Sequence, residues 1–417
     1  MSVSLLKNIA VRAKKASGPL SLLSTEIKNR ALLAMSESLL INKEFILKAN
    51  AKDLVLAKKK GLASSLVARL TLTEAKLKGM ADSIASISGL PDPVGRVIST
   101  TSRPNGLVIQ KVGVPLGVIL IIYESRPNVT ADCMALCLKS GNSVILKGGS
   151  EARFSNRAVY DILRKAASKE GVPQDGFQFI FEDGRKAVKT LLTFSEEINL
   201  VIPRGGEGLI REVTNLSKIP VIKHTKGICH VFVDKDADLK KAEKIVINAK
   251  VQNPAVCNAM ETLLVHENIA NDFLPLISRT LQAKNVELRG CNRTRAVLPG
   301  IKRATEKDWM TEYLDLILSI RVVKNLEEAV SHIGLYGSQH SDAIVTENKE
   351  TAEKFTHAVD SACVFVNAST RFADGGEFGM GAEMGISTDK LHARGPMGLE
   401  ELTSYKYVVA GDGQVRE

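Results

Sequence analysis

Aromatic residues and long apolar runs are both scarce in this sequence. Only 5% of the 417 residues are aromatic, with a single tryptophan, and no apolar run approaches the roughly 20 residues of a membrane-spanning helix. The N-terminus lacks the long apolar segment of a secretory signal and is typical of an amphipathic helix. With 44% hydrophobic and 24% charged residues, we expect an ordinary globular protein of the cytoplasm, not a membrane protein.

Cysteine and histidine are also few, and neither forms a recognised cluster. The six cysteines are scattered and do not make a disulfide framework, which fits a reducing compartment. Cys133 and Cys137 share one face of an expected helix, where core packing explains them. The seven histidines show no spacing typical of metal ligands, so we expect no metal site.

The formal charge of +10 is spread along the chain. No basic stripe is interleaved with stacking residues, so we expect no nucleic-acid partner. A basic surface that attracts an anionic substrate or cofactor explains the charge better. A non-catalytic basic binding protein is the alternative from a different class, and it predicts salt-dependent affinity for nucleic acid.

The length and the patterning predict two or more α/β domains. Residues 1–90 are helix-rich, and from Leu116 apolar strands alternate with helices. The expected strands are 117–122, 143–147, 177–181 and 198–202, and the expected helices are 129–140, 152–169, 186–194 and 207–215. Such alternation indicates a parallel sheet covered on both faces, with ligands at the carboxyl ends of its strands. A second series runs from about Gly227 to Ile386.

A β-hairpin is predicted between the helical region and the first parallel strand. Residues 96–101 and 107–112 flank Asn105-Gly106, and this dipeptide is a strong turn signal because it supplies positive φ. The edges of such a hairpin need a partner. The tail 402–410 can supply a last strand.

Cys257 is the candidate nucleophile. It follows a turn signal, Asn253-Pro254, and precedes an apolar run, 262–265, that is typical of a buried strand. We therefore expect the thiol just before a buried strand, near the side-chain amides of Asn253 and Asn258. Only a thiolate is a strong nucleophile, so a catalytic site needs dipoles that stabilise it. The alternative is that Cys257 is a small buried hydrophobe.

Two strand ends carry candidate cofactor contacts. Lys147 closes an apolar strand and is followed by two glycines and Ser150, an arrangement that lets an anionic ligand approach closely. No acid at 148–150 is available for a ribose 2′-hydroxyl, which favours NADP over NAD. Gly205, Gly206 and Gly208 join a strand to a helix, so they are candidate dinucleotide contacts, although the pattern is not G-x-G-x-x-G. A loop lysine without a ligand is the alternative for Lys147.

Several blocks of the sequence together resemble the aldehyde dehydrogenase superfamily, and closely its glutamate-5-semialdehyde dehydrogenase branch. The resemblance covers nearly the whole chain, and its most specific blocks are VPLGVILIIYESRPNVT (114–130), GNSVILKGGSEA (141–152), LVIPRGGEGL (200–209), KGICHVFVD (226–234), NPAVCNAMETLLVH (253–266), VFVNASTRFADGGEFGMGAEMGIST (364–388) and KLHARGPMGLEELTSYK (390–406). It implies an aldehyde-dehydrogenase-like fold with two parallel-sheet α/β domains and a small β oligomerisation element. The implied boundaries are 1–99 and 113–226 for the NADP-binding domain, 227–389 for the catalytic domain, and 100–112 with 390–417 for the oligomerisation element.

The resemblance also implies an activity. This is the NADPH-dependent reduction of L-glutamyl 5-phosphate to L-glutamate 5-semialdehyde and phosphate through a cysteine thioester, in L-proline biosynthesis. Cys257 matches the superfamily nucleophile, Lys147 the residue at the adenosine ribose, and Glu312 the glutamate that holds the nicotinamide ribose; residues 205–208 match the turn near the pyrophosphate. A homo-oligomer and association with a glutamate 5-kinase are further expectations.

Two departures from the wider superfamily bear on the reaction. The stretch His224-Thr225-Lys226-Gly227 carries no carboxylate where hydrolytic members carry a glutamate base. This suits a reductase, because activated water would waste the thioester, and it argues against the runner-up, a hydrolytic semialdehyde dehydrogenase. The position of the oxyanion asparagine also differs in spacing, and Asn128 is the candidate for it.

The remaining candidates concern the substrate. Arg126 and Arg371 lie in loops that match the substrate side of the superfamily, and each is a candidate clamp for a carboxylate or phosphate. His224 is a candidate proton shuttle. Surface arginines and a structural loop histidine are the alternatives.

Overall fold

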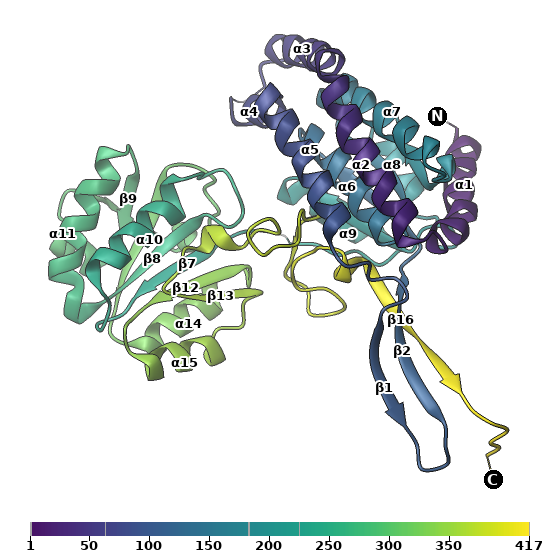
Figure 1. The fold of residues 1–417 in the computed structure, drawn as a ribbon. Coiled ribbons are helices and arrows are strands. Elements are labelled where there is room, and N and C mark those ends of the chain that lie inside the picture. The colour runs from purple at the N-terminus through teal and green to yellow at the C-terminus, as the bar shows by residue number, and fades with distance from the viewer. Residues whose placement is uncertain (1, 63, 182–183, 225, 417) are drawn as a thin grey trace. The chain divides into compact units, whose positions relative to one another are not determined.

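The chain folds into two α/β units. The computed structural model describes residues 2–62, 64–181, 184–224 and 226–416. Unit 1 comprises Met1–Lys223, Gly379–Gly385 and Pro396–Glu417, and unit 2 comprises His224–Phe378 and Ile386–Gly395. Each unit has a parallel sheet with helices packed against it, which confirms the predicted fold class (Figure 1).

The sheet of unit 1 has four parallel strands in the order β5-β4-β3-β6. The strands are β3 (Val118–Tyr123), β4 (Ser143–Gly148), β5 (Phe177–Phe179) and β6 (Leu200–Arg204). Every residue of β3 and β4 is buried, as expected of a parallel strand covered on both faces. The alternation predicted from 117 onwards is therefore confirmed, with β5 ending earlier than expected.

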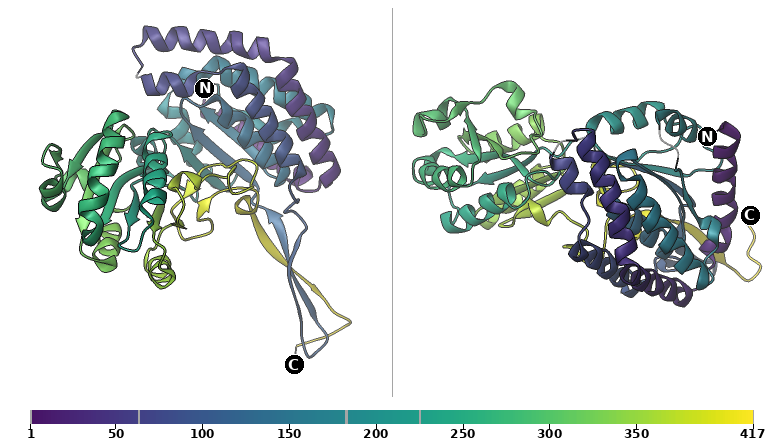
Figure 2. Two further views of the ribbon diagram at one scale, coloured as in Figure 1. Left: turned by 60° about the vertical axis from the view of Figure 1, so that its left-hand side comes forward. Right: turned by 90° about the horizontal axis from the view of Figure 1, so that it is seen from above.

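The helices of unit 1 cover both faces of this sheet (Figure 2). They are α1 (Val3–Ser21), α2 (Thr25–Ile41), α3 (Lys43–Lys59), α4 (Ser64–Leu70), α5 (Glu74–Gly89), α6 (Pro127–Lys139), α7 (Arg153–Lys169), α8 (Arg185–Leu191) and α9 (Glu207–Leu216). The apolar face of α1 packs with α8 and α9 against alternate residues of β3. Ser2, Ser24 and Thr73 cap α1, α2 and α5 through their side-chain oxygens. Cys133 and Cys137 are buried in α6, as predicted.

A separate three-stranded antiparallel sheet belongs to unit 1. It consists of β1 (Val97–Ser102), β2 (Val108–Pro115) and β16 (Thr403–Ala410), with β2 in the centre. Both the predicted hairpin and the predicted C-terminal strand are thus confirmed. We call this sheet the arm, because it extends away from the helices of unit 1 (Figure 1). Nearly all its β1 and β16 residues are exposed, including Tyr405 and Tyr407.

The sheet of unit 2 has seven parallel strands in the order β10-β9-β11-β8-β7-β12-β13. They are β7 (Cys229–Val233), β8 (Met260–His266), β9 (Glu287–Gly290), β10 (Lys302–Arg303), β11 (Ile317–Val323), β12 (Ser341–Val345) and β13 (Cys363–Val366). The helices are α10 (Leu239–Val251), α11 (Glu267–Ala283), α12 (Asn292–Val297), α13 (Glu306–Trp309), α14 (Leu326–Tyr336) and α15 (Lys349–Ala358). Two hydrophobic clusters hold these elements together, and β7, β8 and β12 contribute residues to both. A two-residue strand, β14 (Ile386–Ser387), pairs with β15 (Gly395–Pro396).

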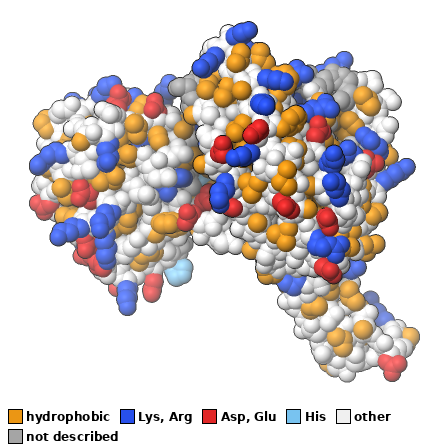
Figure 3. Space-filling view, turned by 45° about the horizontal axis from the view of Figure 1, so that its top comes forward, with side chains coloured by type: hydrophobic (Ala, Val, Ile, Leu, Met, Phe, Trp, Pro, Cys, Tyr) orange, Lys and Arg blue, Asp and Glu red, His pale blue; other side chains and the backbone are white. Residues whose placement is uncertain are grey.

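Basic side chains are interspersed with acidic and apolar ones on the face seen in Figure 3. On the described part of that face, they do not line up in one continuous stripe. Among the described residues, none of the helices combines the length and the apolarity that crossing a bilayer requires.

Candidate active site and cofactor cavity

Three segments of unit 2 bring a thiol and two imidazoles together. Cys257 lies just before β8, His224 lies before β7, and His340 directly precedes β12. These three strands are neighbours and parallel, so their amino ends meet at one edge of the sheet. The Cys257 Sγ and one ring nitrogen of each histidine all lie within 4.8 Å of one another. The two imidazole rings stand edge to face, with their centroids 5.5 Å apart.

The Cys257 thiol is half-buried and its surroundings favour the thiolate. Burial alone raises the pKa of a thiol, because it disfavours the charged form. The imidazoles of His340 and His224 more than offset this effect and hold the pKa of Cys257 well below its ordinary value. A half-buried cysteine with a lowered pKa is the microenvironment of a reactive thiol. The structure thus supports the nucleophile over the inert buried hydrophobe.

Hydrogen bonds fix the orientation of both imidazoles. His224 Nδ1 lies 2.8 Å from the Ile386 carbonyl oxygen, so this nitrogen carries the proton and donates it. His340 is fully buried, and its Nδ1 lies 2.9 Å from the Ser341 hydroxyl. Cys229 lies beneath the site: its thiol donates to the Cys257 carbonyl oxygen at 3.2 Å. Nδ1 is thus engaged by a hydrogen bond in both rings.

Gly227 allows the backbone of the β7 segment to approach the Cys257 turn. A Cβ at this position would lie 2.6 Å from Cys257 Cα and would overlap its carbonyl group. The Gly227 N–H donates to Glu312 Oε1 at 2.9 Å, which brings the predicted nicotinamide-ribose glutamate to the same site. Thr225, within the stretch that lacks a carboxylate, lies outside the described residues.

Glu312 is a half-buried carboxylate in the electrostatic field of the thiol. Burial raises its pKa, the Gly227 hydrogen bond opposes that rise, and the negative charge of Cys257 adds to it. Glu312 lies on the segment that leads into β11, as expected from the apolar run after it. The structure therefore places Glu312, Cys257 and His224 in one site of unit 2.

Arg371 braces the Cys257 turn in this structure. Its guanidinium donates to the Asn258 side-chain oxygen and, at 2.9 Å, to Gln252 Oε1. Asn258 is buried, and its amide donates in turn to the Ala373 carbonyl oxygen at 2.9 Å. The desolvation of Arg371 lowers its pKa from the ordinary value. Its observed contacts are therefore those of a positioning residue, and its role at the substrate stays a prediction.

A buried ion pair joins the two ends of the Cys257 turn. Lys250 Nζ on α10 lies 2.6 Å from Glu261 Oε2 on β8, and both side chains are inaccessible to solvent. Glu261 also accepts the Leu314 N–H at 3.1 Å. Burial raises the pKa of Glu261 to about 7 and lowers the pKa of Lys250. The pair stays buried because each charge compensates the other.

Three of the four candidate cofactor residues of unit 1 line one cavity, and Gly205 is the exception. The cavity measures about 590 Å³ and opens at the carboxyl ends of β3, β4 and β6, as predicted for a parallel sheet. Lys147, Gly206 and Gly208 all contribute to its wall. Lys147 is buried, and its ammonium donates to the Gly148 carbonyl oxygen at 2.8 Å. A cavity of this size suits a small-molecule cofactor.

The N-terminus of α9 already holds a negative charge. The Gly206 N–H donates to Glu124 Oε2 at 3.0 Å, and Gly205 packs against the same carboxylate. A helix N-terminus attracts anions through its unpaired N–H groups and its dipole. Glu151 also lines the cavity, but its carboxylate is bound by the backbone and the hydroxyl of Ser125 at 2.5 and 2.8 Å. The residues present thus fit a phosphate-bearing ligand, with Glu124 as the anion that it would displace.

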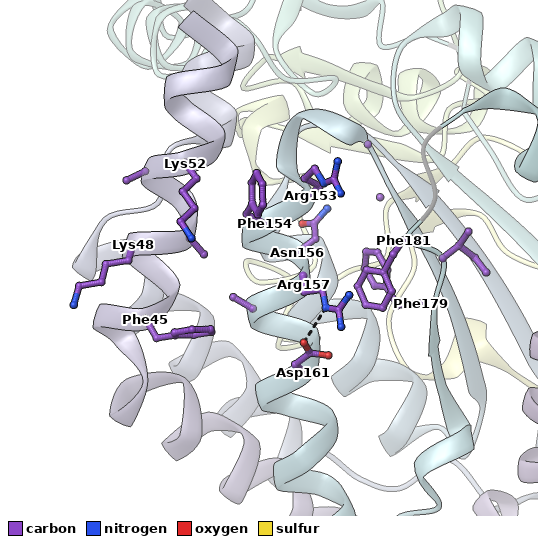
Figure 4. A pocket seen from close by; sticks show the side chains of 16 residues that line it. Phe45, Lys48, Lys52, Arg153, Phe154, Asn156, Arg157, Asp161, Phe179 and Phe181 are labelled. Carbon is purple, nitrogen blue, oxygen red and sulfur yellow. Dashed lines mark hydrogen bonds and ion pairs between the residues drawn. The ribbon is translucent and has the colours of Figure 1, made fainter. Parts of the chain in front are cut away.

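A second cavity lies next to this one and shares Gly148 and Gly149 with it. It measures about 670 Å³ and lies between α3 and α7. Figure 4 shows the basic and aromatic side chains in its wall: Phe45, Lys48, Lys52, Arg153, Phe154, Arg157, Phe179 and Phe181. Asp161 pairs with Arg157 at 3.1 Å. The surroundings of the Lys147 strand end are therefore cationic on this side.

Asn128 and Arg126 lie in unit 1, at the start of α6. Asn128 is exposed, and its amide donates to Asp132 Oδ2 at 3.1 Å. Arg126 is the half-buried N-cap residue of α6. The oxyanion role of Asn128 and the substrate role of Arg126 stay predictions.

Sequence reasoning missed His340, Gly227 and the Lys250–Glu261 pair. His340 stands directly before an apolar strand of the second series, which is the same signal that singled out Cys257. This signal identifies His340 as a site residue only once the strand order is known, because β12 could have lain far from β8 in the sheet. The pairing of Lys250 with Glu261 could be anticipated from two charges that flank the nucleophile turn on a helix and an apolar strand.

We expect Gly227→Ala to slow the alkylation of Cys257 at neutral pH by at least roughly tenfold. The added methyl group displaces the Cys257 turn from its two imidazoles, so the thiol pKa should return towards its ordinary value of about 8.5, at which only a few per cent of the thiol is ionised at neutral pH. Iodoacetamide labelling, followed by peptide mass analysis, measures the rate at Cys257. Gly334→Ala is the control, because nothing lies within 4 Å of its added Cβ. An unchanged rate in Gly227→Ala would contradict this role of the glycine.

We expect Lys250→Met to lower the free energy of unfolding by about 3–5 kcal/mol at pH 7, since it leaves Glu261 buried without a partner. A raised carboxyl pKa in the folded state means that the folded protein binds a proton more readily than the unfolded one. The penalty should therefore shrink as pH falls from 7 towards 5. Urea unfolding at several pH values measures it. The matched control, Lys250→Met with Glu261→Met, should lose less stability; an equal loss would contradict the argument.

A model of the aldehyde dehydrogenase family matches residues 8–289. The γ-glutamyl phosphate reductase of Moorella thermoacetica is 55% identical to this chain over 406 residues, which cover 97% of each chain. The γ-glutamyl phosphate reductase of Carboxydothermus hydrogenoformans is 56% identical over 409 residues, which cover 98% of this chain and 99% of that one. The crystal structure of γ-glutamyl phosphate reductase from Thermotoga maritima is similar with a TM-score of 0.95 and 48% identity, covering 99% of this chain and 100% of that one. This similarity confirms the branch that the motifs predicted, and the chain belongs to the aldehyde dehydrogenase family.

Proposed function

We propose that the chain is an oxidoreductase that reduces L-glutamyl 5-phosphate to L-glutamate 5-semialdehyde and phosphate, a step of L-proline biosynthesis. The observation that carries this function is the similarity to γ-glutamyl phosphate reductases, at more than half identity over 97% or more of both chains. The Cys257 site supplies the chemistry that such a reaction needs, a thiolate nucleophile beside two imidazoles.

The Cys257 thiolate attacks the acyl carbon of the acyl phosphate, and phosphate leaves with the electron pair of the broken C–O bond. A thioester on Cys257 results. A bound nicotinamide cofactor supplies the hydride that reduces this thioester. The C–S bond of the resulting hemithioacetal then breaks, the aldehyde leaves, and the thiolate is regenerated. His224 and His340 stabilise the thiolate at the start and the end of this cycle.

The oxyanion that forms on the acyl carbon needs preorganised donors. We propose the backbone N–H of Cys257 and the side-chain amide of Asn128 for this task. For the substrate, we propose that Arg126 binds the phosphate or the carboxylate, and that His224 shuttles protons. Arg371 is the second candidate for the substrate, through reorganisation of its contacts with Asn258 and Gln252.

The same proposal assigns cofactor contacts to residues of unit 1 and to Glu312 of unit 2. Membership of the aldehyde dehydrogenase family supports the assignment of a nicotinamide cofactor. The glyceraldehyde-3-phosphate dehydrogenase of Methanocaldococcus jannaschii has the same fold, with a TM-score of 0.73 and 16% identity, and its crystal structure contains NADP. We assign Lys147 to the adenosine ribose, Gly205, Gly206 and Gly208 to the pyrophosphate, and Glu312 to the nicotinamide ribose. NADP is favoured because residues 148–150 carry no acid and cationic side chains line the adjoining cavity.

The arm is the proposed oligomerisation element of a homo-oligomer. In the part of the chain that the structure describes, neither edge strand, β1 or β16, pairs with a further strand on its outer side. The exposed fractions of Val97, Ile98, Tyr407 and Val409 lie between 47% and 63%. Exposed apolar edge strands favour pairing with another chain. Because an acyl phosphate hydrolyses readily, the glutamate 5-kinase that makes it is a proposed partner in the cytoplasm.

Reversal of the reaction tests the proposed function. Purified protein supplied with L-glutamate 5-semialdehyde, NADP and phosphate should produce NADPH, measured by its absorbance, and NAD should support a lower rate. Cys257→Ala should abolish the signal, because no nucleophile remains. Cys291→Ala is the matched control, since Cys291 is also half-buried in unit 2 but hydrogen-bonds Thr294 in α12.

The phosphate dependence separates the two enzymatic alternatives. A hydrolytic semialdehyde dehydrogenase would turn over equally well without phosphate, and that result would overturn the proposal. The structure favours phosphate dependence, because the described residues of the 224–227 stretch carry no carboxylate and Glu312 is bound to the Gly227 N–H.

We expect Tyr407→Lys together with Val409→Lys to convert the homo-oligomer to smaller species. The two substitutions place charges on an edge strand that would otherwise bury apolar side chains. Light scattering coupled to gel filtration measures the mass, and circular dichroism confirms that the chain is folded. Leu335→Lys, which charges an exposed leucine of α14 (71% exposed), should leave the mass unchanged. If the arm variant kept the wild-type mass, this assignment of the arm would be wrong.

A further inference from the structure

The three functional groups at Cys257 form a donor set for a metal ion. The Cys257 Sγ and one nitrogen each of His224 and His340 lie within 4.8 Å of one another. Thiolate and imidazole together are the ligands that Zn²⁺ and its spectroscopic substitute Co²⁺ prefer, whereas Mg²⁺ and Ca²⁺ prefer oxygen. The three residues come from segments far apart in the sequence, so no ligand-spacing motif could have shown the set.

The orientation of the imidazoles fits metal binding. A neutral histidine binds a metal through one nitrogen while its other N–H is held by a hydrogen bond. His224 meets this condition, since its Nδ1 donates to the Ile386 carbonyl oxygen at 2.8 Å. In His340, Nδ1 lies 2.9 Å from the Ser341 hydroxyl, and Nε2 is buried with no hydrogen-bond partner among the described residues. A buried ring nitrogen without a partner is costly unless a ligand binds it.

The spacing requires only a small adjustment. Zinc–ligand bonds of about 2.0–2.3 Å place the ligand atoms of a tetrahedral site roughly 3.3–3.8 Å apart. Cys257 and His224 are half-buried, so rotation of their side chains can close a gap of about 1 Å. The carboxylate of Glu312 lies in the same site, where it accepts the Gly227 N–H at 2.9 Å. The thiolate neutralises one of the two positive charges of the ion.

We propose that Cys257, His224 and His340 bind Zn²⁺ reversibly, and that the bound ion blocks the nucleophile. Three protein ligands leave a fourth position for water, as in an open zinc site. The binding itself rests on the geometry of these residues alone; only its consequence, loss of reductase activity, rests on the proposed function. Zn²⁺ would then inhibit the reductase by binding the Cys257 thiolate, and a chelator would reverse this inhibition.

Cobalt binding to the full-length protein tests the site without using activity. Titration with Co²⁺ should give one equivalent per chain, with the visible bands of a tetrahedral ion and a near-ultraviolet thiolate-to-cobalt band; Zn²⁺ should abolish both, and Mg²⁺ should abolish neither. Cys257→Ala should remove the thiolate band. His340→Ala and His224→Ala should each weaken binding by at least roughly tenfold. Circular dichroism shows whether each variant is folded, and His340→Gln is the smaller change if the alanine variant is not.

Alkylation provides a second readout on the unmodified protein. Stoichiometric Zn²⁺ should protect Cys257 from iodoacetamide, and EDTA should restore the labelling. Cys291→Ala is the control and should change neither the cobalt spectrum nor the protection. A thiolate band that survives Cys257→Ala, affinity unaffected by both histidine variants, or labelling unaffected by Zn²⁺ would overturn the inference. Cobalt binding in a protein that lacks the phosphate-dependent reaction would overturn only the proposed function.

Discussion

The close approach of Gly227 to the Cys257 backbone is the constraint on which the candidate active site depends. A side chain at position 227 would overlap the Cys257 carbonyl group, so the two segments can pack only if this residue is glycine. The same approach lets the Gly227 N–H hold Glu312 and lets Cys229 donate to the Cys257 carbonyl oxygen. The absence of a side chain at Gly227 therefore sets the positions of Cys257, the candidate nucleophile, and of the Glu312 carboxylate.

The two parallel sheets place their functional residues at opposite ends. In unit 1 the cavity opens at the carboxyl ends of β3, β4 and β6, where the α9 N-terminus attracts anions. In unit 2 the thiol and the imidazoles precede β8, β7 and β12, at the amino ends. Parallel sheets generally bind ligands at the carboxyl ends of their strands. The cavity of unit 1 follows this rule, and the candidate nucleophile of unit 2 does not. Packing of adjacent loops, not the sheet dipole, assembles the thiol site.

Much of the fold could be predicted because the local signals are strong. The uninterrupted apolar run of β3 and the Asn105-Gly106 turn each determine local structure by themselves. His340 could not be recognised in this way, since its meaning depends on the lateral order of strands, which local periodicity does not encode. Arg371 shows a second limit: the sequence indicates a cation in a loop, but only the structure shows that Asn258 and Gln252 engage it.

The low pKa of Cys257 suits an acyl phosphate better than an unactivated substrate. Lowering a thiol pKa increases the thiolate fraction at neutral pH but reduces the nucleophilicity of each thiolate, with a Brønsted coefficient of about 0.4–0.5. Phosphate is a good leaving group, so the smaller intrinsic nucleophilicity costs little at the first step. The same low pKa makes the thiolate a good leaving group when the C–S bond breaks. In the proposed cycle, His340 and His224 would therefore assist both ends through one electrostatic effect, because both lower the pKa of Cys257. A hydrolytic enzyme would also need a base for water at this site.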